Sequence, residues 1–593
     1  MQYSSEQRTC QSCHQGFVIE DEDFEFYKKI SVPPPTFCPE CRTRRRMAWR
    51  NESSLYKRVC GMCGKSIIAI YAPQSPFVVY CKDCWISDQW DPISYGRDYK
   101  KDISFFTQFH ELLEVVPLVV ADRKGSMENS EYGNYNGNCK NCYLCFSTAL
   151  SEDSMYCSNS QELKQCADST GLRNGELCYE AVDCEKNYRC VFTDRTRESA
   201  DSRFLFGCSN CVNCFMSANL RNKSNVFRGE QLSPEEYKKR ILSINFGDFE
   251  VFKELKEEFN KMKTLALHKN AEIKNSVQAT GDNITNSKNV FNSFDVNDSE
   301  NIKHSLRILK GCRDIQDCHG MVGGELVYEG FGCGFSPRHN LFSFSVDVSS
   351  DLTYCAMCHD CSNCFGCVAL KNKQYCVLNK QYTKEEYGKL VSEIIRRMDE
   401  VPYIDKKNIK YKYGEFFPEE LSPFGYNETI AQDNFPLSES DAIEKGYSWM
   451  DTKKKDYSIT VKIDDIPRQI EDVDELITRE VFQCKHDGLC DERCSGAFRI
   501  TPQEFILYKK LSIPIPRLCP SCRHFERLKR RNPLKLWHRK CQCAGTKSEN
   551  GVYTNTTKHQ HREGKCSNEF ETSYAPEREE IVYCEQCYQN EVV

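Results

Sequence analysis

The chain has 593 residues, of which 39% are hydrophobic and 28% are charged, and its formal net charge is -6 at pH 7. This length predicts several domains. The net charge argues against a protein that coats nucleic acid along its whole length, although it allows a local basic face. The chain shows no apolar run long enough to span a bilayer and no secretory signal pattern, so we expect a cytoplasmic protein that does not enter membranes.

Cysteine is the outstanding residue type, with 38 copies in the chain. A small secreted protein would use so many cysteines in disulfides, but this chain is large and carries no export pattern. Under reducing conditions, cysteine pairs at short spacing more often hold metal ions. The composition therefore predicts thiolate metal sites.

The first predicted module covers residues 1–98 and contains four C-x2-C pairs. Two such pairs close a tetrahedral site of four thiolates, which stabilises a fold and leaves no open position for catalysis. We expect one zinc ion in each of two sites, with iron as the chemical competitor. The predicted ligands are Cys10, Cys13, Cys38 and Cys41 in the first site, and Cys60, Cys63, Cys81 and Cys84 in the second.

After a connecting helix over residues 99–128, the middle of the chain is duplicated. Residues 208–237 match residues 358–387 at an offset of 150 without a gap. A shorter repeat also runs through each half. Cysteines recur every 24 residues in the first half and every 21 or 22 residues in the second. Repeats of this length with short β-type runs predict two parallel β-helix (solenoid) halves, at 129–232 and 271–382. These cysteines are Cys142, Cys166, Cys190 and Cys214, and then Cys312, Cys333, Cys355 and Cys376.

Two interpretations of the solenoid cysteines stay open. Regular spacing favours a stacked interior column, because cysteine packs as a small apolar residue. Dense local spacing around residues 355–367 allows additional metal. Each half is expected to lead into a helical segment, at 233–270 and 383–399, and residues 400–480 are expected to form a connector.

The last predicted module, residues 481–593, repeats the design of the first. Cys13 to Cys38 and Cys494 to Cys519 both span 25 positions. The copy is less regular, since an insertion separates Cys541 from Cys566. The choice between Cys541 and Cys543 stays open, as do the roles of Cys484, His486, His559 and His561. The predicted ligands are Cys490, Cys494, Cys519 and Cys522, and then Cys541, Cys566, Cys584 and Cys587.

These motifs carry a family resemblance. The C-x2-C pair, the Phe26-Tyr27-Lys28-Lys29 segment and the C-P-x-C-R motif with its following arginines resemble a family of zinc-ribbon modules. With its repeat region, the whole chain resembles long, cysteine-rich multi-zinc proteins of candidate-phyla bacteria. The resemblance implies zinc, about four ions per chain, and little about activity. The expected fold is mainly β and multidomain, with zinc-ribbon or treble-clef modules at both termini around the two β-helix halves.

A basic stretch after each C-P-x-C-R motif is the best indication of function. Arginines beside a metal site can grip phosphates, which predicts binding of RNA, DNA or a ribonucleoprotein. The alternative is that they pair internally, for example with the acidic run 20–23. The candidate residues are Arg42, Arg44, Arg45, Arg46, Arg50, Arg523, Arg527, Arg530 and Arg531.

Catalytic motifs are lacking: the chain has no P-loop, dinucleotide fingerprint, H-E-x-x-H or G-x-S-x-G. We therefore expect a non-enzymatic zinc scaffold that binds nucleic acid. The first alternative is a structural or protein-interaction scaffold without nucleic acid. The second is a β-helix enzyme acting on a polymer or glycan, with Asp347, Asp351 and Asp360 as its carboxylates and His339 or His359 nearby.

Overall fold

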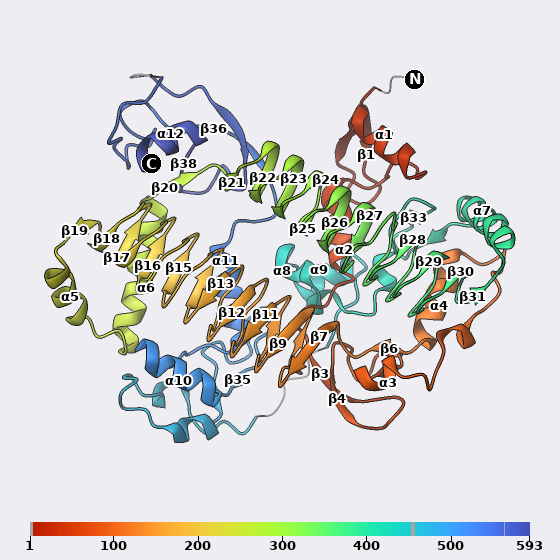
Figure 1. Cartoon of the computed structure of the whole chain (residues 1–593), viewed down its shortest axis with the longest axis horizontal. Helices are drawn as coiled ribbons and strands as arrows, with labels where there is room; N and C mark the ends of the chain where they lie inside the picture. The colour runs from red at the N-terminus through yellow and green to blue at the C-terminus, as the bar shows by residue number, and fades with distance from the viewer. Residues whose placement is uncertain (1–3, 452–456, 562–563) are drawn as a thin grey trace. The chain divides into compact units, whose positions relative to one another are not determined.

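The computed structural model describes residues 4–451, 457–561 and 564–593, and it is mainly β (Figure 1). The chain divides into two compact units, each built from two separate stretches. Unit 1 combines Met1–Asp122 with Glu272–Met450, and unit 2 combines Arg123–Ala271 with Asp451–Val593. Each unit therefore holds one cysteine-rich module and one repeat region, and the N-terminal module shares its unit with the second repeat region. The bounds of the eight segments drawn from the sequence stay a prediction.

The N-terminal module of unit 1 consists of two successive hairpin-and-helix motifs. In each motif a short antiparallel hairpin, β1–β2 or β3–β4, is followed by a helix that begins at a cysteine, α2 or α3. The helix α4 and the strand β6, which pairs with β5, complete this part. The elements are β1 (Glu6–Thr9), β2 (Gly16–Ile19), α1 (Asp21–Lys29), α2 (Pro39–Met47), β3 (Tyr56–Val59), β4 (Ser66–Ala69), β5 (Val79–Tyr80), α3 (Lys82–Ile86), α4 (Phe105–Val115) and β6 (Leu118–Val119).

The first repeat region, in unit 2, is a series of short strands that pair in parallel. Each residue pairs with the residue 12 positions later, as in Gln161↔Arg173 and Val191↔Arg203. The predicted period of 24 positions is therefore two steps. The strands are β7 (Arg123–Glu128), β8 (Gly133–Asn134), β9 (Asn136–Lys140), β10 (Cys145–Phe146), β11 (Ala149–Glu152), β12 (Gln161–Lys164), β13 (Arg173–Glu176), β14 (Tyr179–Val182), β15 (Val191–Asp194), β16 (Arg203–Phe206), β17 (Val212–Ala218), β18 (Ser224–Phe227) and β19 (Glu230–Gln231).

The second repeat region, in unit 1, follows the same rule with several irregular steps, the first of which pairs Ile273 with Ile284, 11 positions later. Glu300↔Arg313 and Glu325↔Arg338 are 13 positions apart, which explains why the cysteine spacing of this copy is less regular. The strands are β21 (Ile273–Lys274, which lies with its partner β22 at the start), β22 (Val277–Thr285), β23 (Lys288–Asn297), β24 (Glu300–Lys303), β25 (Leu306–Leu309), β26 (Arg313–Val322), β27 (Glu325–Phe331), β28 (Ser350–Thr353), β29 (Ser362–Phe365), β30 (Gln374–Val377) and β31 (Lys380–Gln381).

A three-residue pattern underlies both repeat regions. In most steps every third residue has a positive φ, as at Asn138, Asn141 and Leu144, and the residues that follow these three are buried. Asparagine and aspartate tolerate this conformation better than most residues. They also form ladders between successive steps: the Asn141 side chain donates to Asp153 at 2.9 Å, and Asn289 donates to Asn301 at 2.9 Å.

Cysteines fill much of the interior of these steps, together with aliphatic side chains such as Ile302 and Leu352 in the second region. Cys142 and Cys355 are buried, and their thiols lie 3.4 Å from the carbonyl oxygens of Ser151 and Cys364. A buried thiol that donates to a carbonyl needs no metal, because its weak hydrogen-bonding capacity is already used. The contacts agree with the stacked-column interpretation of the repeat cysteines.

Helices follow each repeat region, and the first helical segment is broken between Leu242 and Phe249. It consists of α5 (Pro234–Leu242) and α6 (Phe249–Leu265), after which β20 (Leu267–Lys269) pairs with β38 of the C-terminal module. The second is α7 (Lys384–Glu400), which begins with a capping box formed by Thr383 and Glu386. Residues 401–450 form irregular structure with β32 (Tyr403–Ile404), β33 (Lys410–Tyr411), α8 (Ile430–Asn434) and α9 (Glu439–Glu444).

The C-terminal module of unit 2 repeats the hairpin-and-helix order of the first. Its hairpins are β34–β35 and β36–β37, and its helices α11 and α12 again begin at cysteines. The elements are β34 (Phe482–Gln483), β35 (Ala497–Phe498), α10 (Pro502–Leu511), α11 (Pro520–Arg530), β36 (Trp537–Lys540), β37 (Glu569–Thr572), β38 (Ile581–Tyr583) and α12 (Glu585–Val592).

Across the described ranges, we find no helix with the length and apolar character needed to cross a membrane.

Candidate metal centres

Four groups of four cysteines gather in the terminal modules, two in each. In every group the four sulfur atoms lie within 4.8 Å of one another, so each group could hold a metal ion. Three groups contain the four cysteines that their spacing predicts, and in the third group Cys484 stands where the spacing predicts Cys490. The groups are Cys10, Cys13, Cys38 and Cys41; Cys60, Cys63, Cys81 and Cys84; Cys484, Cys494, Cys519 and Cys522; and Cys541, Cys566, Cys584 and Cys587.

All four groups are assembled from one hairpin and one helix N-terminus. In the first, Cys10 and Cys13 lie in the loop between β1 and β2, and Cys38 is the N-cap residue of α2. Cys81, Cys519 and Cys584 are likewise the N-cap residues of α3, α11 and α12. The partial positive charge at a helix N-terminus favours thiolates, so two ligands of every group are placed where deprotonation is easiest.

Backbone amides add to this stabilisation. The amide of Cys81 donates to Cys60 Sγ, that of Cys519 to Cys484 Sγ, and that of Cys584 to Cys541 Sγ, each at 3.2 Å. A hydrogen bond to a thiolate favours its charged form. At Cys60, burial raises the pKa of the thiol, but the amides of Cys63 and Cys81 outweigh burial and lower that pKa to about 6.

The sulfur spacing fits a tetrahedral ion. Zinc–thiolate bonds of about 2.3 Å require sulfur atoms about 3.8 Å apart. The distance is 3.7 Å from Cys13 Sγ to Cys38 Sγ, 3.9 Å from Cys63 Sγ to Cys81 Sγ, and 3.9 Å from Cys566 Sγ to Cys584 Sγ. Four soft donors at these separations suit a closed structural site.

The third group differs from the sequence prediction, because Cys484 takes the place of Cys490. Cys484 directly follows β34, as Cys10 directly follows β1, and Cys494 precedes β35, as Cys13 precedes β2. The loop between these ligands spans 10 positions in the C-terminal copy and 3 in the N-terminal copy. The sequence prediction places Cys490 here as the lengthened C-x2-C partner of Cys494, and that ligand assignment stays a prediction.

Cys490 lies beside this third group. Its sulfur is 3.7 Å from Cys522 Sγ and 3.2 Å from His486 Nδ1. His486 also faces Glu492 at 3.6 Å. A sequence signal for Cys484 existed. Phe498 follows Phe17 by 481 positions, as Cys494 follows Cys13, and this match marks the second strand of the hairpin whose first strand precedes Cys484.

The arginines of unit 1 that were predicted to meet nucleic acid are mostly buried against the second repeat region. On α2, Arg42 Nη2 lies 2.8 Å from Asp317 Oδ2, and Arg46 Nη2 lies 3.3 Å from Asp317 Oδ1. Asp317 is fully buried on β26. Burial alone would raise the pKa of this carboxyl, but Arg42 and Arg46 hold it below its usual range.

Arg45, on the same helix, is fully buried and joins two further carboxylates. Its guanidinium lies 2.7 Å from Glu329 and 2.9 Å from Glu415. Arg50 lies 2.8 Å from Glu52, and half-buried Arg44 lies 3.7 Å from the sulfur of Cys41. The basic stretch of this module is thus committed to contacts within unit 1.

Unit 2 contains the same arrangement. On α11, Arg523 Nη1 lies 3.0 Å from Asp168 Oδ2 and Arg527 Nη1 lies 2.6 Å from Asp168 Oδ1. Asp168 is fully buried in the first repeat region. Arg523 and Arg527 are 481 positions after Arg42 and Arg46, and Asp317 is 149 positions after Asp168, so the two contacts are equivalent.

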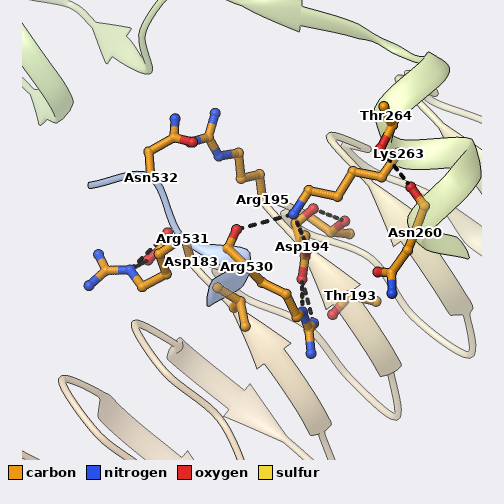
Figure 2. A network of polar contacts seen from close by, with 12 residues as sticks. Asp183, Thr193, Asp194, Arg195, Asn260, Lys263, Thr264, Arg530, Arg531 and Asn532 are labelled. Atoms are coloured by element: carbon orange, nitrogen blue, oxygen red, sulfur yellow. Dashed lines mark hydrogen bonds and ion pairs between the residues drawn. The ribbon is translucent and has the colours of Figure 1, made fainter. Parts of the chain in front are cut away.

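Further residues extend the contact in unit 2. Figure 2 shows Lys263 of α6 and Arg530 of α11 meeting at Asp194, with Nζ 2.6 Å and Nε 3.1 Å from its carboxylate. Arg531 lies beside them, 3.0 Å from Asp183. An aromatic pair is also repeated: Tyr27 packs on Tyr328 in unit 1, and the equivalent Tyr508 packs on Tyr179 in unit 2.

The residues considered for catalysis form local pairs between successive steps of the second repeat region. His339 lies 2.8 Å from Asp351, and His359 lies 3.2 Å from Asp347. A cavity of ≈ 590 Å³ in unit 2 is lined by residues of α6 and α12, among them Glu591. Glu591 already accepts hydrogen bonds from Thr556. These contacts offer no argument for the enzyme alternative.

No protein-family model and no curated protein matches this chain. The resemblance to zinc-ribbon modules and to multi-zinc bacterial proteins therefore stays a prediction. The four-cysteine clusters near both termini rest on the geometry alone.

Proposed function

We propose that this protein is a non-enzymatic zinc scaffold in which each terminal module clamps one repeat region. The observation that carries the proposal is the repeated docking contact, in which Arg42 and Arg46 meet Asp317 in one unit and Arg523 and Arg527 meet Asp168 in the other. The metal site fixes the first turn of the helix, and the helix then presents its arginines to the buried carboxylate. Metal binding and docking would be coupled in this way.

In this proposal the repeat regions are parallel β-solenoids with a 12-residue coil. Parallel pairing at steps of about 12 residues, a recurring positive φ at every third residue and a continuous buried interior support it. Stacked coils bury a continuous core only when several are present, and terminal coils need covering. The modules and helices would supply such cover.

Zinc is the proposed metal, held in a treble-clef arrangement. Four thiolates at tetrahedral spacing suit both zinc and iron, and the closed, redox-free role of a structural clamp favours zinc. One knuckle on a hairpin and one at a helix N-terminus favour the treble clef over a ribbon of two hairpins. Free thiolates would require a reducing compartment.

The partner is proposed to be a protein and not nucleic acid. Most of the arginines on which the nucleic-acid prediction depends are buried and face carboxylates, as at Arg45 and Arg527. Exposed faces of the repeat regions instead carry mixed-charge ladders such as Lys186–Glu198 and Lys288–Glu300. A surface of alternating sign suits polar protein contacts better than a polyanion. Binding of RNA, DNA or a ribonucleoprotein stays a prediction.

Hydrogen exchange measured by mass spectrometry tests the clamp. We expect removal of metal to abolish protection in α2 and α11 and to lower it in β26 and β14, and added zinc to restore it. If α2 and α11 exchange freely while their repeat strands keep full protection, the modules do not clamp the repeat regions.

A pull-down from native lysate, with and without nuclease, tests the class of partner. We expect protein partners that survive nuclease treatment. Binding to RNA or DNA that weakens steeply between about 50 and 200 mM salt would instead support the nucleic-acid prediction.

A further inference from the structure

The C-terminal module contains a third ligand cluster beside its two four-cysteine groups. It arises in the insertion between Cys541 and Cys566, which supplies Cys543, His559 and His561. Together with Cys587 of α12, these residues form a group whose ligand atoms lie within 4.8 Å of one another. Two sulfurs and two imidazoles form one of the usual donor sets of structural zinc.

The contacts in this cluster converge on one point. Cys543 Sγ lies 3.2 Å from His559 Nδ1 and 3.4 Å from His561 Nε2, and Cys587 Sγ lies 3.4 Å from His561 Nε2. Donors around one zinc ion at about 2.0 to 2.3 Å are separated by about 3.3 to 3.8 Å. The observed distances are close to this range.

Each histidine is oriented by its other ring nitrogen. His559 Nε2 lies 2.7 Å from Glu591 Oε1, and both side chains are fully buried. His561 Nδ1 lies 2.9 Å from the carbonyl oxygen of Gly564. Carboxylate and carbonyl partners of this kind fix the tautomer of a metal-ligating histidine, so that the free nitrogen points at the metal.

Cys543 is positioned by a separate contact. The Asn555 side chain amide donates to its sulfur at 3.3 Å, and Tyr583 donates to the Asn555 oxygen at 2.9 Å. Glu591 lies one helical turn after Cys587 on α12, so the same helix face provides both a ligand and the group that orients His559.

We propose that Cys543, His559, His561 and Cys587 bind a fifth metal ion, and that the Cys587 thiolate bridges it to the ion held by Cys541, Cys566 and Cys584. Cys587 belongs to both groups, and a thiolate sulfur has lone pairs enough for two metals. Five thiolates and two neutral histidines around two Zn²⁺ ions carry a net charge of only −1. The insertion would then be held by metal instead of by a hydrophobic core.

This inference rests on the zinc scaffold proposed above, but the number of bound ions distinguishes failure of the fifth site from failure of the scaffold. Native mass spectrometry of the full chain should give five zinc ions, and the His559→Ala/His561→Ala variant should give four. A wild-type chain that carries four ions, with no loss in this variant, would overturn the fifth site while leaving the scaffold intact. Fewer than four ions would count against both proposals.

Matched substitutions separate a bridging from a terminal cysteine. Cys587→Ser should weaken binding of two ions, whereas Cys84→Ser, at the equivalent position of the N-terminal module, should weaken binding of one. His538→Ala is the control for loss of a histidine in the same module, because His538 lies on the exposed face of β36 against Glu569 and Glu571. It should keep five ions, and a loss equal to that of the double histidine variant would contradict the site.

Cobalt gives a readout that does not depend on folding of a variant. With Co²⁺ in place of zinc, two ions joined by one thiolate couple magnetically, so the integrated EPR signal should fall below that of five isolated ions. A signal equal to the cobalt content of a five-ion chain would contradict the bridge.

Discussion

The two units share the same arginine–aspartate contact but differ in the loops that carry their metal ligands. In both, a helix that starts at a ligand cysteine presents two arginines to one buried aspartate of a repeat region. In unit 1 the ligand loops are short, with three positions from Cys10 to Cys13. In unit 2 the corresponding loop spans ten positions, and a second insertion separates Cys541 from Cys566.

This difference shows which parts of the design tolerate change. The hairpin ends and the helix N-terminus place the ligands, so the loop between two ligands can lengthen without moving the site. The Arg–Asp contact has no such freedom, because a buried charge requires its partner at hydrogen-bonding distance. The comparison therefore predicts that the units respond alike when docking is broken and differently when the loops are altered.

Metal removal should have the largest effect and should act on both units. Structural zinc sites contribute about 10 to 16 kcal/mol of binding free energy in small modules. A chelator should therefore lower the unfolding temperature of the whole chain strongly, as followed by circular dichroism, and zinc should reverse the change. An unchanged melting curve after confirmed metal loss would show that the clusters are not structural sites.

Asp317→Asn and Asp168→Asn should destabilise their units by similar amounts. Each substitution leaves two buried arginines without their shared carboxylate, at a cost of about 3 to 5 kcal/mol. Denaturant unfolding followed by hydrogen exchange can assign the loss to each unit. Asp360→Asn, an exposed aspartate of the second repeat region, is the control and should change stability little. A large loss in one unit and none in the other would break the proposed equivalence.

Cys484→Ser and Cys490→Ser test the lengthened loop of unit 2. Replacing Cys484 should weaken binding of one metal ion, because its sulfur belongs to the third group. Replacing Cys490 should leave the metal content unchanged, as measured by elemental analysis. The opposite result would restore the ligand set predicted from spacing.

The pH dependence of unit 2 should show a smaller effect, to which its buried His268 contributes. Burial lowers the pKa of His268 to about 3, whereas an unfolded histidine titrates near 6.5. The unfolded state therefore binds more protons below pH 6.5, and stability falls as the pH falls from 6.5 toward 3, by up to about 1.4 kcal/mol per pH unit.

His268→Leu supplies the matched comparison, because Leu118 occupies the corresponding position of unit 1, opposite Val79 as His268 lies opposite Val582. Denaturant unfolding between pH 7 and 5.5 should show a weaker pH dependence in this variant. An identical slope in the two proteins would show that His268 titrates in the folded state as it does in the unfolded chain.

The ligand groups could be read from the sequence where their spacing was intact. Cys10, Cys13, Cys38 and Cys41 follow from two C-x2-C pairs, because local spacing alone brings two sulfurs together. Cys484 could not be found in this way, since the hairpin that places it is only two residues long on each strand. Likewise, Cys543 and the two histidines depend on how an insertion folds back over α12.

The partners of the arginines were beyond the reach of sequence patterns. Arg42 and Asp317 are 275 positions apart, and neither lies in a motif that points to the other. The parallel repeat was predicted, but its period was read as 24 from Cys142, Cys166, Cys190 and Cys214, although Cys178 lies 12 positions from both Cys166 and Cys190. Serine occupies two steps of this column, at Ser154 and Ser202, and so obscures the shorter period.

A double-mutant cycle between Arg527 and Asp168 tests the central claim most directly. The claim is that the basic helices are internal clamps. The free energies of unfolding of Arg527→Met, Asp168→Asn and the double variant should be non-additive by about 1 to 3 kcal/mol, with the double variant less destabilised than the sum of the two. Additivity within about 0.5 kcal/mol would contradict the clamp and leave the arginines free for another role.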